Sequence, residues 1–164
     1  MKTKVIRFIG FSGSGKTTLI EKIIKQLSDE GMNIATVKHD VHGLEIDKPG
    51  KDSYRYSVAG ARVSVVSSPD LTVFKIHKKL DLDDIILNIK DVDLIIIEGY
   101  STESNYPTIS VARKDTRKGI KGELKDLIAV VSDYNDNELK EMGYEGQSFD
   151  INKIKEIIEY IKKL

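Results

Sequence analysis

The 164-residue chain contains no cysteine. This absence excludes disulfide bonds, thiolate catalysis and cysteine-ligated zinc. The chain also lacks an excess of either charge, because lysine and arginine balance aspartate and glutamate at 26 each. A neutral chain gives no electrostatic case for nucleic acid or an anionic membrane as a general partner.

Long apolar runs are missing as well. No hydrophobic stretch approaches the length of a membrane-spanning helix. The N-terminus enters a strand-like segment almost at once, which does not resemble a signal peptide. Internal repeats and low-complexity stretches are not found. We therefore expect one cytoplasmic domain over residues 1–164, with no membrane or nucleic-acid partner.

A phosphate-binding pattern occurs near the start of the chain. Residues 10–17 read GFSGSGKT and fit G-x-x-x-x-G-K-[ST]. Residues 4–9 before them predict a short buried strand. The residues after them predict a helix, because apolar side chains recur there at helical spacing: Leu19, Ile20, Ile23, Ile24 and Leu27. The pattern requires this order of strand, turn and helix, so nucleotide or phosphate binding is predicted.

The residue types in this loop explain the prediction. Glycines let successive backbone N–H groups point inward, and the start of the helix adds unpaired N–H groups. Lys16 is predicted to bridge the β- and γ-phosphates, and the Thr17 hydroxyl to bind Mg²⁺. The predicted nucleotide-binding residues of this segment are Gly10, Ser12, Gly13, Ser14, Gly15, Lys16, Thr17 and Thr18.

The rest of the chain predicts strands alternating with helices. An unbroken apolar run at residues 94–97 precedes Glu98 and indicates a strand covered on both faces. Further strands are predicted at residues 33–38, 62–66, 71–76, 107–111 and 127–131, the second and third as a hairpin. A helix over residues 151–161 is expected, with Asp150 as its N-cap. Together these indicate a three-layer α/β/α fold of the P-loop nucleotide triphosphate hydrolase type, with a mostly parallel sheet.

Acidic residues and a histidine follow several of these strands. Ligands of such sheets bind at the carboxyl ends of the strands, so Glu98, His39, Asp40 and Asp133 are expected at one edge. Glu98 is predicted as a catalytic residue with Lys16, and as a Mg²⁺ ligand. Its alternatives are a helix N-cap partner or an exposed residue after a strand.

The segment after the second predicted strand narrows the family. It reads KHDVH at residues 38–42, DKPGKDSYR at 47–55 and AGA at 59–61. In order and spacing these motifs resemble the MobB family, the molybdopterin-guanine dinucleotide biosynthesis adapter. The resemblance continues through EGY at 98–100 and SFD at 148–150. The chain departs from the family at Ser101, where a lysine is usual.

The resemblance implies a role in molybdenum cofactor synthesis. It implies a protein that binds GTP with Mg²⁺, hydrolyses GTP weakly, and forms a homodimer. It also implies association with the guanylyltransferase that joins GMP to molybdopterin, with molybdopterin itself as a further candidate ligand. The sequence agrees with weak catalysis, because no glutamine is clearly placed to orient water and no arginine finger stands out.

Several residues leave alternatives open. His39 is predicted to contact phosphate or a bound cofactor, or else to be an exposed loop residue. A metal site shared with His42 would lack a clear third ligand. Asp40 would either coordinate Mg²⁺ through water or stabilise a turn. Asp133 is a candidate acceptor for the N1–H and N2–H₂ edge of guanine, although the chain has no N-K-x-D motif.

A basic loop lies between two predicted strands. Its residues are Arg113, Lys114, Arg117, Lys118 and Lys121. The loop is either a solvated segment or a flap over an anionic substrate such as a pterin phosphate or the nucleotide. Arg113 or Lys114 is a candidate replacement for the lysine missing at position 101. This loop is also compatible with an alternative function, a P-loop small-molecule kinase that uses ATP. A switch-type GTPase is a third hypothesis.

Overall fold

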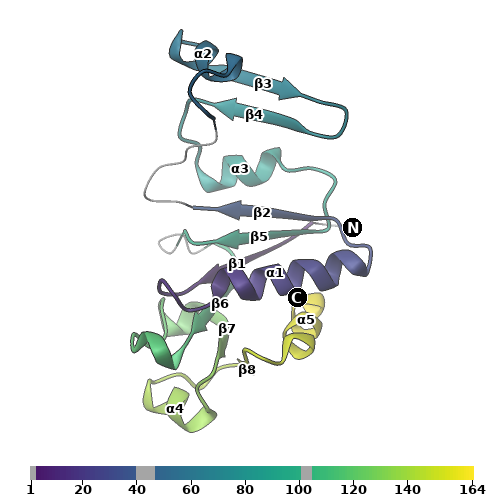
Figure 1. The fold of residues 1–164 in the computed structure, drawn as a ribbon. Helices are drawn as coiled ribbons and strands as arrows, with labels where there is room; N and C mark the ends of the chain where they lie inside the picture. The colour runs from purple at the N-terminus through teal and green to yellow at the C-terminus, as the bar shows by residue number, and fades with distance from the viewer. Residues whose placement is uncertain (1–2, 40–46, 101–104) are drawn as a thin grey trace. The chain divides into compact units, whose positions relative to one another are not determined.

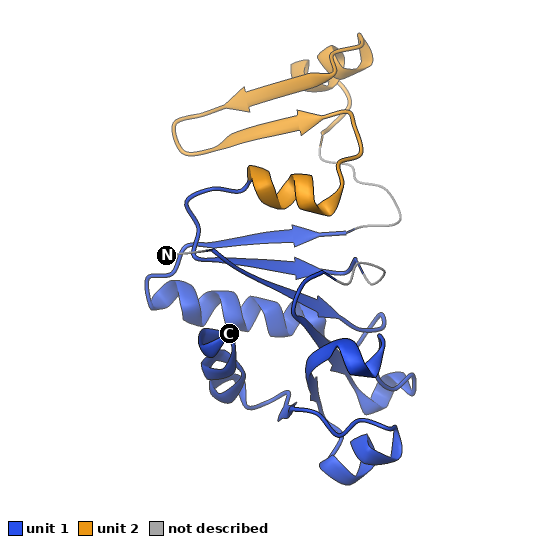
Figure 2. Ribbon diagram, turned by 180° about the vertical axis from the view of Figure 1, so that it is seen from behind, with its two compact units in different colours: residues 1–39, 89–164 blue, residues 40–88 orange. Residues whose placement is uncertain are grey.

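A computed structural model of the chain describes residues 3–39, 47–100 and 105–164 (Figure 1). The chain divides into two compact units (Figure 2). The first comprises Met1–His39 and Ile89–Leu164, and the second is Asp40–Asn88. The first unit contains the phosphate-binding pattern. That residues 1–164 act as a single nucleotide-binding domain stays a prediction.

A six-stranded sheet with parallel neighbours forms the centre of the first unit. In spatial order its strands are β2 (Ile34–Lys38), β5 (Leu94–Glu98), β1 (Lys4–Ile9), β6 (Thr108–Ala112), β7 (Leu127–Ser132) and β8 (Ser148–Asp150). β2 and β5 lie on one side of β1, and the later strands β6, β7 and β8 lie on its other side. A ligand crevice is therefore expected at the carboxyl end of β1.

Helices α1 (Lys16–Asp29) and α5 (Ile154–Lys163) lie side by side on one face of this sheet (Figure 1). Their apolar sides and the strand residues facing them form one buried core, which includes Phe8, Leu19, Ile23, Ile96, Ile109, Val131, Ile157 and Ile158. The Tyr160 hydroxyl donates a hydrogen bond to the Ile128 carbonyl oxygen at 2.8 Å and ties α5 to β7. Burial of this face is the main source of stability for the unit.

The opposite face of β7 packs against a second, smaller cluster. Successive strand residues point to opposite faces, so Val130 lies on the side away from Val131. Val130 packs with Leu139 of α4 (Asp136–Glu141) and with Tyr144. Two short 3₁₀ turns, η1 (Lys114–Thr116) and η2 (Leu124–Asp126), precede β7. The predicted three-layer α/β/α fold with a mostly parallel sheet is confirmed.

The second unit is small and has an exposed apolar surface. It contains α2 (Asp52–Val58), the antiparallel hairpin of β3 (Val63–Ser67) and β4 (Thr72–Ile76), and α3 (Leu82–Asn88). The hairpin predicted from sequence is confirmed. Asp47 accepts a hydrogen bond from the Ser53 hydroxyl at 3.0 Å and forms an ion pair with Lys75 at 3.4 Å. These contacts join the start of the unit to α2 and β4.

Two elements differ from the sequence prediction. Asp150 is the last residue of β8, and the N-cap position of α5 belongs to Lys153, so the predicted cap is wrong. The Asp150 carboxylate instead accepts hydrogen bonds from the backbone and side-chain N–H groups of Asn152. Helix α4 was not predicted. In the described part of the chain, no helix has the length and apolar character needed to cross a membrane.

Candidate functional site

The phosphate-binding loop connects β1 directly to α1. β1 ends at Ile9, and α1 begins at Lys16 with Gly15 as its N-cap residue. Gly13 and Gly15 have φ of 81° and 82°, a left-handed conformation that favours glycine. A Cβ on Gly10 would lie 2.4 Å from the Val111 carbonyl oxygen, so the loop passes close to β6 there. The loop therefore needs its glycines for the shape that it has.

The interior of the loop fits an anion. The Ser14 side chain is 1% exposed, and its Oγ forms no hydrogen bond with any described residue. A buried hydroxyl without a partner is costly, and a ligand oxygen would satisfy it. The first N–H groups of α1 have no acceptor within the helix and carry the positive end of its dipole. Ser12 and Thr18, also predicted to bind nucleotide, are both exposed.

Lys16 lies within the loop rather than in open solvent. Its Nζ donates hydrogen bonds to the carbonyl oxygens of Gly10 at 3.0 Å and Phe11 at 2.9 Å. Burial lowers the pKa of Lys16, the nearby Glu98 carboxylate opposes that shift, and the positive charges of Lys121 and Lys38 add to it. An ammonium that is partly desolvated and close to other cations gains from a bound anion.

Thr17 and Glu98 meet although they are far apart in sequence. The Thr17 hydroxyl is 3.1 Å from Glu98 Oε1 and 3.3 Å from Oε2. Lys38 Nζ lies 3.7 Å from Oε1 of the same carboxylate. A hydroxyl and a carboxylate side by side fit Mg²⁺, which usually takes few protein oxygens and completes its shell with phosphates and water. Asp40, the third predicted Mg²⁺ ligand, lies outside the described residues.

The remainder of the described chain offers no rival metal centre. Across residues 3–39, 47–100 and 105–164, no group of three or more histidine and acidic side chains is placed to hold a metal ion. His42, considered as a metal ligand with His39, is not among the described residues. His39 itself is exposed, and its backbone N–H donates to the Glu98 carbonyl oxygen at 3.0 Å.

The turn after β5 is held in an unusual backbone conformation. Gly99 and Tyr100 have φ of 94° and 51°, and the Tyr100 ring lies 4.6 Å from the His39 ring between centroids. Arg7 is 4% exposed and donates from Nη1 to the Tyr100 carbonyl oxygen at 2.6 Å. Arg7 thus anchors the turn that follows Glu98. Arg7 was not among the predicted site residues, although a charged side chain inside an apolar strand was a signal.

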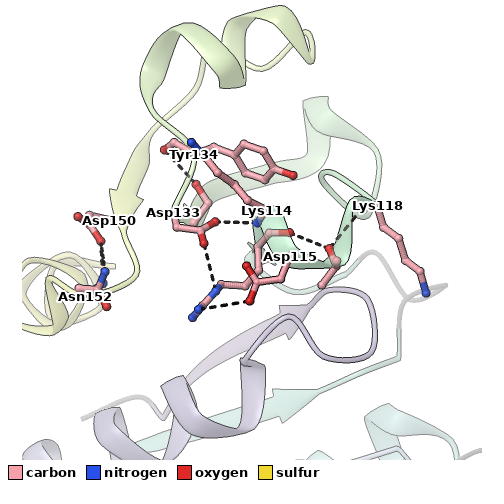
Figure 3. Close-up of polar contacts among 10 residues, drawn as sticks. Lys114, Asp115, Lys118, Asp133, Tyr134, Asp150 and Asn152 are labelled. Carbon is pink, nitrogen blue, oxygen red and sulfur yellow. Dashed lines mark hydrogen bonds and ion pairs between the residues drawn. The ribbon is translucent and has the colours of Figure 1, made fainter.

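Asp133 is engaged by the basic loop. Its Oδ1 accepts a hydrogen bond from the Lys114 backbone N–H at 2.8 Å, and its Oδ2 lies 3.3 Å from Arg113 Nε (Figure 3). Lys114 Nζ forms an ion pair with Glu138 at 2.7 Å. Asp133 and Asp150 line a cleft of about 880 Å³ at the carboxyl ends of β7 and β8. This cleft was not predicted, because it depends on α4 and β8.

These features define a P-loop nucleotide-binding fold: the glycine-rich loop lies between β1 and α1, and a carboxylate stands at the end of β5. The family model of molybdopterin guanine dinucleotide synthesis protein B, MobB, matches residues 5–133. The chain therefore belongs to the MobB family, as its sequence motifs predicted.

Individual relatives agree with this assignment. A putative molybdopterin-guanine dinucleotide biosynthesis adapter protein of Methanocaldococcus jannaschii is 38% identical over 140 residues, which cover 82% of this chain and 57% of that protein. The chain thus matches little more than half the length of that relative. The adapter protein of Haemophilus influenzae is 29% identical, with 93% of this chain and 84% of that protein covered. The crystal structure of Bacillus subtilis MobB has a TM-score of 0.72 at 26% identity and covers 95% of this chain and 96% of its own.

Proposed function

We propose that this chain binds GTP with Mg²⁺ and acts as an adapter in the synthesis of molybdopterin guanine dinucleotide. The contact of the Thr17 hydroxyl with the Glu98 carboxylate, beside the phosphate-binding loop, carries this proposal. Family membership supplies the pathway, since the relatives from H. influenzae and M. jannaschii are named as adapter proteins, the latter putatively. Binding of GTP and of Mg²⁺ is our own proposal beyond family membership.

Each group of the loop has a part in this proposal. The N–H groups at the start of α1, with Ser14, would bind the phosphate oxygens, and Lys16 would leave the carbonyl oxygens of Gly10 and Phe11 to reach the β- and γ-phosphates. Thr17 and Glu98 would hold Mg²⁺. The bound ion neutralises negative charge on the phosphates. Glu98 and Lys16 remain the proposed catalytic residues for a weak GTP hydrolysis.

Asp133 is the proposed reader of guanine. A carboxylate has about four lone-pair positions, so its contacts with Lys114 and Arg113 leave acceptor capacity toward the cleft. Guanine offers two adjacent donors that adenine does not offer together. An Asp133→Asn variant would place an amide donor opposite the two donors of guanine. It should therefore lose the preference for GTP over ATP. Arg113→Met, which keeps the carboxylate, is the matched control and should retain the preference.

The decisive experiment for nucleotide binding is calorimetry with GTP and ATP in parallel, with Mg²⁺ present. We expect GTP to bind more tightly. Lys16→Ala should weaken binding about tenfold or more, because it removes a charged hydrogen-bond donor. Lys125→Ala, at an exposed lysine of η2, is the control and should bind like the wild type. Preference for ATP would contradict the proposal and favour the small-molecule kinase.

The metal site is tested by Glu98→Gln, which keeps the shape of the side chain and removes its charge. GTP affinity of this variant should no longer rise when Mg²⁺ replaces EDTA. In EDTA its affinity should be at least that of the wild type, because the variant lacks a carboxylate that repels the phosphates. If Mg²⁺ raised the GTP affinity of this variant as much as that of the wild type, Glu98 would not be a ligand of the metal.

The proposed partner is a molybdenum cofactor guanylyltransferase, and molybdopterin is a further proposed ligand. Adding the wild-type chain with GTP to this enzyme and molybdopterin should raise the rate of dinucleotide formation. Lys16→Ala should not raise it. Equal rates with and without the wild-type chain would contradict the adapter role. They would not contradict the proposed nucleotide binding.

We also propose that the chain forms a homodimer through the β3–β4 hairpin. Val63 and Val65 on β3 lie opposite Ile76 and Phe74 on β4, and each is between 45% and 68% exposed. A two-stranded hairpin is marginally stable in water, and an exposed apolar face of this kind marks an interaction surface. A second copy carries the same face, so a symmetric pair would bury both.

A further inference from the structure

The basic loop contains two kinds of cation. Arg113 and Lys114, at its start, are neutralised by acidic neighbours. Arg113 lies 3.3 Å from Asp133 and 3.9 Å from Asp115, and Lys114 lies 2.7 Å from Glu138. These two residues therefore bring little net positive charge to the phosphate-binding loop.

Lys118 and Lys121, later in the same loop, are placed differently. Neither ammonium forms an ion pair with any residue in the described part of the chain. Each Nζ lies 5.7 Å from the centroid of the Phe11 ring, a cation–π distance. Phe11 is the second residue of the phosphate-binding loop, and its carbonyl oxygen accepts a hydrogen bond from Lys16. Three ammonium groups therefore contact one residue of that loop.

The fold holds these lysines close to the phosphate-binding loop. The backbone N–H of Lys121 donates to the hydroxyl of Ser110, a fully buried residue of β6, at 3.2 Å. A Cβ on Gly122 would lie 2.6 Å from the end of the Ile9 side chain, so the loop closes tightly against the last residue of β1. At the other end, the Lys114 backbone N–H is bonded to Asp133. Both ends of the loop are thus attached to the sheet.

Clustered ammonium groups repel one another. The Phe11 ring offsets part of this repulsion, but it carries no charge. The positive charge of Lys121 is among the causes that lower the pKa of Lys16, after burial. A polyanion that contacted all three groups would relieve the repulsion and displace little, because Lys118 and Lys121 would give up no ion pair.

We propose that Lys118 and Lys121 form a clamp for the terminal phosphate of the bound nucleoside triphosphate, with Phe11 as the surface on which the clamp rests. This inference depends on the proposed nucleotide function and extends it, because it assigns the preference for a triphosphate over a diphosphate to these two lysines. The terminal phosphate is chosen because Lys16, which contacts the same residue, reaches the far end of the phosphate chain.

The test is the double variant Lys118→Met with Lys121→Met, which keeps apolar side chains against Phe11 and removes both charges. Affinities for GTP and GDP are measured by calorimetry in Mg²⁺ at two salt concentrations. We expect GTP binding to weaken about tenfold or more, GDP binding to change little, and the salt dependence of GTP binding to decrease. The double arginine variant should restore GTP binding, because it restores the charge.

Two controls separate the possible failures. Lys125→Met removes an exposed lysine from the same region and should not change the ratio of GTP to GDP affinity. Thermal unfolding of each variant shows whether it is folded. If the wild type binds GTP and Lys16→Ala does not, an unchanged GTP to GDP ratio in the double methionine variant overturns the clamp alone. If the wild type fails to bind GTP, both the clamp and the proposed function are overturned.

Discussion

At the scale of single residues, Gly10 shows how closely the phosphate-binding loop is packed against the sheet. Any side chain there would approach the Val111 carbonyl oxygen, at 2.4 Å, and Ser14 Oγ, at 2.6 Å. The first of these is backbone of a central strand and cannot move cheaply. Gly13 differs, because a Cβ there would meet nothing within 4 Å, although its φ of 81° is unfavourable for alanine.

These two glycines give a matched pair of substitutions. Gly10→Ala should lower the free energy of unfolding by about 1–3 kcal/mol, as overpacking in a core does. Gly13→Ala should cost about 1 kcal/mol, from backbone conformation alone. Urea denaturation at equilibrium measures both. Equal losses would contradict a close approach of Gly10 to the Val111 carbonyl oxygen.

At the scale of elements, the sequence predicted long apolar segments well and short polar ones poorly. The strand predicted over residues 4–9 is β1 with the same bounds, and α1 begins where the pattern placed it. β8 has three residues, too few for alternation to be seen, and was missed. Helix α4 had a local signal that was overlooked, because Asn135 and Glu138 have the spacing of a capping box.

The capping box of α4 can be tested directly. The Asn135 side chain accepts from the Glu138 backbone N–H at 3.0 Å, and the Glu138 carboxylate accepts from the Asn135 N–H at 2.7 Å. Asn135→Ala should therefore lower the free energy of unfolding by about 1 kcal/mol. Asn137→Ala, at an exposed position inside the same helix, is the control and should be neutral or slightly stabilising. Equal effects in thermal unfolding would contradict the role of the cap.

At the scale of the whole molecule, the proposed dimer depends on the hairpin. Phe74 is 68% exposed and lies at the centre of its apolar face. Phe74→Glu should convert the dimer to a monomer at micromolar concentration, because a symmetric interface would bring two uncompensated carboxylates together. Light scattering after size-exclusion chromatography measures this. Leu164→Glu, at an exposed leucine of the other unit, should leave the mass unchanged. A monomeric wild type would refute the dimer.

The sequence by itself determined the fold class, the phosphate-binding loop and the family. These features are local, since glycines at fixed offsets between one strand and one helix set the shape of the loop, and the motifs of the family lie in short runs. Only the tertiary structure decided which distant residues meet. Thr17 and Glu98 are 81 positions apart, and their contact follows from the pairing of β1 with β5. The division of the basic loop into paired and unpaired cations likewise depends on where the fold places Asp133, Glu138 and Phe11, because charge neutralisation acts through space and not along the chain.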